Sequence, residues 1–228
     1  TNPFPFVILI FMKQYSAFIL HVTFFLGLSA FLPLKAADCS MYQRPVTVRV
    51  NIHPGTVRYN NSLSNSQFPS KPYASTMGLT VAQLPINMQA KSFVREDSTG
   101  ACIGLDELTV NVGFPKIDVY IDKKYRPGTC QYNVIKEHEN YHVRVQQEGL
   151  TFFGGKIEEA FQIAANKIKP RSLSSPGQAQ SILNQMVAQV KKDVDPLIKF
   201  VEKRLREENE VIDTDEAYRE TSKKCKKW

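Results

Sequence analysis

Residues 131–148 read QYNVIKEHENYHVRVQQE, and here the apolar spacing of the chain changes from that of strands to that of a helix. On a helical wheel Val134, Ile135 and Val145 share one face, whereas most of the charged and amide side chains fall opposite. Gly149 follows, and glycine suits the left-handed conformation that often ends a helix. The stretch therefore predicts an amphipathic helix that ends at Gly149.

Two histidines lie on the apolar side of this predicted helix. His138 and His142 are four residues apart, so their imidazoles stand about one turn apart and can chelate one zinc ion. Glu139 points roughly 100° away around the helix, which places its carboxylate beside such a metal, where it can take a proton from an attacking water. The alternative is a pair of hydrogen-bonded core histidines with Glu139 as a surface charge. The high cost of burying unpartnered imidazoles favours the metal.

Strand patterns precede the helix. Residues 45–60 alternate apolar and polar side chains on both sides of Pro54 and Gly55, which predicts a β-hairpin with His53 as a surface residue at its turn. Three further strands are predicted, at residues 84–95, 102–112 and 116–122.

Helical patterns follow it. Apolar side chains recur at helical spacing in residues 155–168 and again from residue 178 to about residue 220, where Pro196 is expected to kink or divide the helix. Strands first and helices second predict the α+β class: a small antiparallel sheet, followed by the helix with the two histidines and then by long C-terminal helices.

At the sequence His138-Glu139-Asn140-Tyr141-His142 the chain resembles the zincin metallopeptidases, in which a strand precedes a helix that carries this motif. The layout also resembles small secreted bacterial zinc-dependent proteases. The resemblance implies a peptidase that uses Zn²⁺, with His138 and His142 as metal ligands and Glu139 as the general base. It also implies that residues 117–121 form an edge strand along which the substrate lies, with Val119 and Ile121 in that strand.

A catalytic zinc usually has a third protein ligand. Residues 155–160, GKIEEA, are similar to the Gly-x-x-x-Glu-Ala pattern of gluzincins, and this resemblance implies Glu159. Glu158 is the alternative because it lies nearer the apolar stripe of the predicted helix. Acids near the carboxyl end, such as Glu210 and Asp213, also remain open. Two tyrosines are candidate donors to a developing oxyanion by residue type alone, namely Tyr141 and Tyr218.

The amino-terminal 37 residues have the pattern of an export signal. No acidic residue occurs from Pro3 to Leu34, and the signal pattern starts at Met12 with a basic residue next to it. Cleavage near Ala36 or Ala37 is expected, with residues 1–11 upstream of the natural start. An uncleaved membrane anchor is the alternative. Residues 38–228 are then expected to form a single secreted or periplasmic domain without stable membrane insertion.

Four cysteines lie beyond the expected cleavage site, and an even number in an exported chain indicates two disulfides. Three pairings are possible from the sequence. The bracketing of a probable strand pair favours Cys102 with Cys130, which leaves Cys39 with Cys225 to tie the ends together.

The formal net charge of +7 is concentrated partly in the lysines after residue 222, which are interpreted as solvated. No nucleic-acid module is recognisable, so the expected partner is a peptide or protein substrate and not a nucleic acid. Two other functions remain open: a non-catalytic envelope or interaction protein that keeps the fold, and a zinc amidase that acts on cell-wall peptides. The sequence does not indicate an oligomeric state.

Overall fold

The longest strand, β5 (Gly100–Gly113), shows how the sheet meets the core. In its second half Leu108, Val110 and Val112 are fully buried, and the residues between them are half-exposed and polar or charged. One face of the strand therefore contacts the core and the other faces solvent. The same alternation continues on the neighbouring strands β1 (Thr47–His53) and β4 (Ile86–Asp97).

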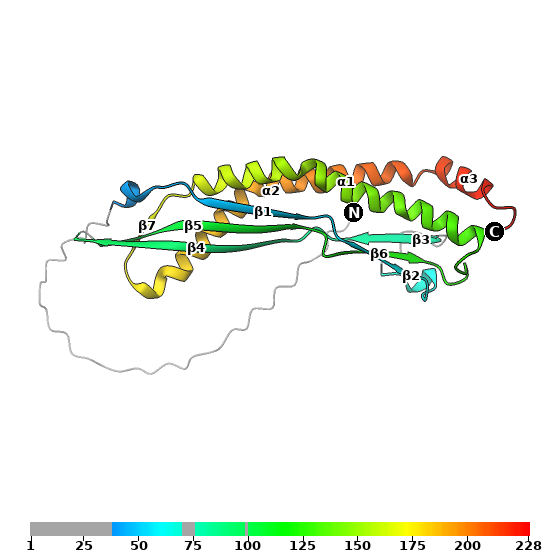
Figure 1. Ribbon diagram of the computed structural model, residues 1–228, viewed down its shortest axis with the longest axis horizontal. Coiled ribbons are helices and arrows are strands. Elements are labelled where there is room, and N and C mark those ends of the chain that lie inside the picture. Colours follow the sequence, from blue (N-terminus) through cyan, green and yellow to red (C-terminus); the bar gives the residue numbers. More distant parts are fainter. Residues whose placement is uncertain (1–37, 70–75, 99) are drawn as a thin grey trace, which may run out of the picture. The chain divides into compact units, whose positions relative to one another are not determined.

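The computed structural model describes residues 38–69, 76–98 and 100–228. Its strands form two small mixed sheets (Figure 1). The first has the order β1-β5-β4, and the short strand β7 (Arg171–Leu173) also pairs with β5. The second has the order β2-β6-β3, from strands β2 (Thr56–Asn60), β6 (Lys116–Ile121) and β3 (Gly78–Ala82).

The predicted hairpin about Pro54 and Gly55 is wrong. β1 does not turn back onto β2; β1 pairs in parallel with β5, and β2 pairs in parallel with β6. The chain passes from the first sheet to the second twice, once after β1 and once after β5. The two crossings lie side by side, because the Phe114 N–H donates to the His53 carbonyl at 2.9 Å. The backbone change there uses positive φ angles at Gly55 (86°) and Gly113 (150°), which glycine adopts readily.

In the described part of the chain, three α-helices and three short 3-10 helices complete the fold. The α-helices are α1 (Cys130–Asn166), α2 (Ala179–Ile212) and α3 (Asp215–Lys223). The 3-10 helices are η1 (Cys39–Tyr42), η2 (Asn65–Gln67) and η3 (Pro176–Gln178). Strands and long C-terminal helices together confirm the α+β class.

The expected helix end at Gly149 is also wrong, because α1 runs through it for a total of 37 residues. A Cβ at Gly149 would collide with the Leu205 side chain of α2, so the glycine here permits close helix packing and does not end the helix. Pro196 likewise does not divide α2, which continues on both sides of it. At Gly149, tertiary packing has overridden a local signal for a helix end.

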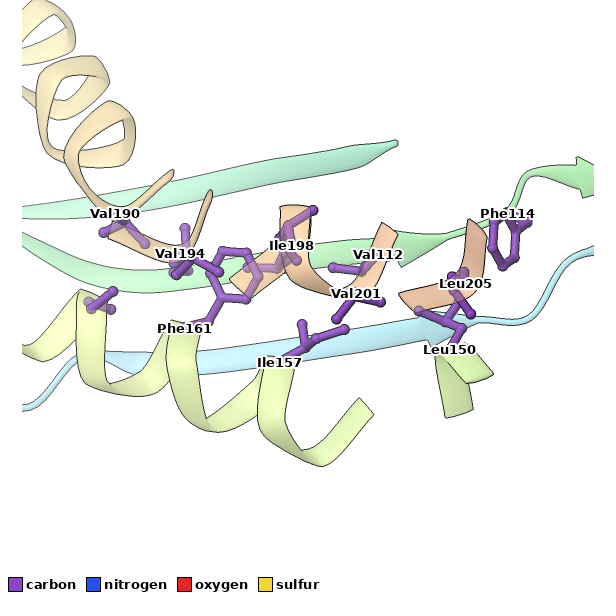
Figure 2. Packing of buried hydrophobic residues seen from close by; sticks show 14 of the residues in the cluster. Val112, Phe114, Leu150, Ile157, Phe161, Val190, Val194, Ile198, Val201 and Leu205 are labelled. Atoms are coloured by element: carbon purple, nitrogen blue, oxygen red, sulfur yellow. The ribbon is translucent and has the colours of Figure 1, made fainter. Parts of the chain in front are cut away.

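The core lies between the two long helices and the first sheet. α1 packs against β1, and α2 packs against β5 and β4. Figure 2 shows how side chains of α1 meet those of α2 and the Val112 side chain of β5. Among the buried residues of the two helices are Leu150, Ile157, Phe161, Ile198, Val201 and Leu205. Because Gly149 meets Leu205 and His142 meets Asn209, the two helices run antiparallel.

Both pairs of cysteines form disulfides, but in a pairing that the sequence did not favour. The structure joins Cys39 to Cys102 and Cys130 to Cys225. The first bond ties η1 to β5. The second joins the first residue of α1 to the segment after α3, which holds α3 beside the amino-terminal half of α1. Disulfides of this kind persist in oxidising compartments and are compatible with a secreted or periplasmic protein.

The expected export signal, with its start at Met12 and its cleavage site near Ala36 and Ala37, lies outside the described residues. Within the described ranges, none of the helices combines the length and the apolar character that crossing a bilayer requires.

The crossing between the two sheets gives a stability prediction. A Cβ at Gly113 would collide with the His53 carbonyl, and the φ of 150° is strained for any other residue. We expect Gly113→Ala to lower the free energy of unfolding by at least about 2 kcal/mol. Gly155→Ala is the matched control: it lies in α1 with open space around it and should raise stability by roughly 0.5–1 kcal/mol. Urea unfolding measures both, and equal effects would contradict the described crossing.

Candidate metal centre and cleft

Helix α1 brings the histidine pair to the inner side of the molecule. The helix starts cleanly, because the Thr129 side chain caps it by accepting a hydrogen bond from the Tyr132 N–H at 3.3 Å. Two turns later His138 and His142 are 9% and 8% exposed, and Glu139 is 4% exposed. Three polar side chains buried on one helix face require partners from elsewhere in the chain.

Asp213 is the partner of both histidines. It follows the last residue of α2, and its Oδ1 lies 3.1 Å from His138 Nε2 and 3.2 Å from His142 Nε2. The two Nε2 atoms are themselves 3.2 Å apart. Three donor atoms thus form a nearly equilateral triangle, which is the one group of His, Cys, Asp and Glu in the described ranges that is arranged to hold a metal ion.

Asn209 fixes the protonation of His142. The Asn209 side-chain NH₂ donates to the Leu205 carbonyl, so its Oδ1 is free to accept from His142 Nδ1, which lies 2.8 Å away. In neutral His142 the proton is then on Nδ1, and Nε2 directs a lone pair at the triangle. A neighbour that holds the other ring nitrogen in this way is typical of metal-binding histidines.

The donor set fits zinc. Donor atoms around a tetrahedral zinc with bonds of about 2.0 Å lie roughly 3.3 Å apart, close to the three distances of the triangle. Hydrogen bonds alone satisfy the contact with Asp213 only when His142 is an imidazolium, because a neutral His142 protonated at Nδ1 cannot donate from Nε2. A metal cation bound by all three atoms takes the place of that proton. Two imidazoles and one carboxylate also form a ligand set that zinc accepts.

The groups of the cluster shift one another's pKa values. Burial alone would lower the pKa of His142, but its hydrogen bond to the Asp213 carboxylate and the charge of Glu139 raise it above its ordinary value. Partial burial acts to raise the pKa of Asp213, yet hydrogen bonds with His138, His142 and Tyr218 hold it far below its ordinary value. Asp213 is therefore a carboxylate at neutral pH and is ready to bind a cation.

Tyr218 covers the cluster from α3. Its hydroxyl donates to Asp213 Oδ1 at 2.8 Å, and its ring centroid lies 5.3 Å from that of His138. The disulfide between Cys130 and Cys225 holds α3 in this position. Tyr141, the other tyrosine considered, is 46% exposed and stacks under Arg144, so it does not take part in the cluster.

Glu139 occupies a tight polar niche next to the cluster. Thr80 Oγ1, on β3, donates to Glu139 Oε2 at 2.8 Å. Gly78 lies so close that a Cβ there would collide with the carboxylate. Burial raises the pKa of Glu139 above its ordinary value, although the two histidines and Thr80 act in the opposite direction. A raised pKa makes this carboxylate a better proton acceptor than an exposed glutamate.

A cleft of about 650 Å³ leads to the cluster. β3 forms one wall, α2 forms the other, and α1 forms the base. From α1 the lining includes Glu139, His142 and Gln146, and from α2 it runs from Glu202 to Asn209. A second, smaller cavity of about 20 Å³ is lined by His138 and Glu139 together with Tyr218 and Thr221 of α3.

Two sequence-based assignments need correction. Because α1 is continuous, Glu159 lies 17 residues beyond His142 on the same helix, about 26 Å along its axis, and Glu158 is almost as far. The structure therefore does not bring either glutamate to the histidines. The acid that lies beside the two histidines is Asp213, which was predicted only as one of several acids near the carboxyl end.

The expected substrate strand also differs. β6, which contains Val119 and Ile121, pairs with β2 on one side and β3 on the other, so it is the central strand of its sheet and both residues are buried. The edge strand that lines the cleft is β3, a strand that was not predicted from the sequence. Its pattern GLTVA is short, and only the pairing with β6 and the contact of Thr80 with Glu139 reveal its role.

Comparisons with known proteins do not extend these observations: no family model, curated protein or solved structure shows significant similarity to the chain. The interpretation of the site therefore depends on its own geometry.

The role of Asn209 can be tested by metal binding. Asn209→Ala removes the group that directs the His142 lone pair, and we expect zinc affinity to fall roughly 10-fold to 100-fold. Asn184→Ala is the matched control, since Asn184 is an exposed residue of the same helix. Competition with a chromogenic chelator measures both affinities. Unchanged affinity in Asn209→Ala would show that Asn209 does not orient His142.

Proposed function

We propose that this chain is a secreted or periplasmic zinc-dependent peptidase, with His138, His142 and Asp213 as metal ligands and Glu139 as the general base. The observation that carries the proposal is the triangle of donor atoms beside a buried carboxylate, at the end of a cleft with an open strand edge. The resemblance of residues 138–142 to the zincin motif supports the peptidase, and the two disulfides support the secreted or periplasmic location.

The open edge of β3 suits an extended peptide. β3 pairs only with β6 among the described strands, so its other edge offers backbone N–H and C=O groups to the cleft. A peptide paired with this edge passes Thr80 and therefore passes Glu139. This arrangement favours peptides over other substrates of hydrolytic enzymes.

Zinc, when bound, supplies a Lewis acid that polarises a carbonyl oxygen and activates water. The protein residues supply the rest. Glu139 takes a proton from the attacking water and returns it to the departing amine, while Thr80 keeps the carboxylate in place. Tyr218 has a hydroxyl at the cluster and can turn from Asp213 to donate to the developing oxyanion.

The peptidase function predicts a specific separation of metal binding from activity. In Glu139→Gln the shape of the side chain is kept and the base is lost, so we expect peptide hydrolysis to fall at least about 100-fold while zinc binding is retained. The measurement is mass spectrometry of a mixed peptide pool after incubation, together with the metal content of the same sample. Glu148→Gln, at an exposed residue of the same helix, is the control and should leave hydrolysis intact.

Two other outcomes would favour one of the alternative functions. Zinc binding without hydrolysis of any peptide by the unmodified protein would contradict the peptidase and indicate a non-catalytic metal-binding module. Hydrolysis confined to cell-wall peptides would indicate the amidase instead.

A further inference from the structure

One basic side chain in the cleft has no role in the site described above. Arg206 is an exposed residue of α2 and lines the cleft. Apart from His142, it is the only basic residue among the described residues of the lining. Since nothing in the metal centre requires a positive charge at this position, its presence points to the substrate.

Among the described residues Arg206 has no partner in an ion pair, unlike its neighbours on α2. Elsewhere in α2, Lys199 pairs with Asp195 at 2.6 Å and Arg204 pairs with Glu208 at 2.7 Å, both at a spacing of four residues. Arg206 has glutamates four residues away in both directions, Glu202 and Glu210, yet within the described ranges it forms a salt bridge with neither of them. Its guanidinium group is therefore available to a ligand in the cleft.

Arg206 lies near the metal centre along α2. Asn209 and Asp213 follow it at spacings of three and seven residues, so all three lie on one helix face. Seven residues correspond to about 10 Å along the helix axis. An extended peptide advances about 3.4 Å per residue, so a group bound by Arg206 lies within about three residues of the bond beside Glu139.

We propose that Arg206 is a specificity-determining residue that binds a carboxylate of the peptide substrate within about three residues of the bond that is cleaved. A guanidinium group binds a carboxylate through two parallel hydrogen bonds, which gives both charge selection and direction. The carboxylate belongs either to an acidic side chain or to the free carboxyl terminus of the peptide. This inference rests on the proposed peptidase function.

Three peptides of otherwise matched sequence separate the two sources. The first has an acidic side chain and an amidated terminus, the second has neutral side chains and a free carboxyl terminus, and the third has neutral side chains and an amidated terminus. Hydrolysis by the zinc-loaded protein gives kcat/KM for each peptide, and fluorescence anisotropy gives its affinity for the zinc-loaded Glu139→Gln variant.

We expect one of the two carboxylate peptides to be preferred over the neutral peptide, and Arg206→Gln to reduce that preference roughly 10-fold to 100-fold. Arg206→Lys should keep part of it, because a lysine retains the charge but not the paired hydrogen bonds. Arg204→Gln is the matched control: Arg204 lies on the same helix, pairs with Glu207 and Glu208, and does not line the cleft. It should leave the preference unchanged.

The outcomes distinguish this inference from the proposed function. An equal preference in wild type and Arg206→Gln, or the absence of any preference for a carboxylate, would overturn the role of Arg206 even if peptides are cleaved. If no peptide is cleaved but binding by the Glu139→Gln variant still depends on Arg206, the peptidase fails and carboxylate recognition stands.

Discussion

The contact of Asp213 with His138 and His142 is the constraint on which the rest of the site depends. It joins the end of α2 to the amino-terminal half of α1, and the two histidines have no other carboxylate at this distance in the described part of the chain. The antiparallel packing of the two helices makes this contact possible, because it carries the carboxyl end of α2 back to the third and fourth turns of α1. The core between them, from Phe161 to Leu150, fixes the register.

The carboxyl-terminal segment closes the same region. Cys225 is bonded to Cys130, Lys224 pairs with Glu137 at 3.1 Å, and the Trp228 ring packs edge-on against Tyr125. These contacts hold α3 across the end of the cleft and bring Tyr218 onto Asp213. A helix of nine residues with no buried side chain has little stability of its own, so the disulfide is central to its position.

The sequence was sufficient for features that depend on local spacing. The helical period of residues 131–148 placed His138 and His142 on one face with Glu139 beside them, and alternation located three of the strands close to their observed bounds. It was insufficient where two residues in contact lie far apart in the sequence. Asp213 is 71 residues from His142, and no periodicity indicates that α2 ends beside α1. Gly149 was predicted to end the helix because its packing against Leu205 cannot be inferred from the sequence. Glu159 was favoured on a resemblance that required a helix break there.

Zinc stoichiometry in three variants tests the central claim most directly. The purified protein should bind one zinc ion per chain, His138→Ala and Asp213→Ala should lose tight binding, and Glu159→Ala should retain it, since Glu159 lies about 26 Å along the helix from His142. Circular dichroism of each variant verifies that it remains folded. Loss of zinc in Glu159→Ala with full retention in Asp213→Ala would contradict the account, as would a wild-type protein that binds no zinc.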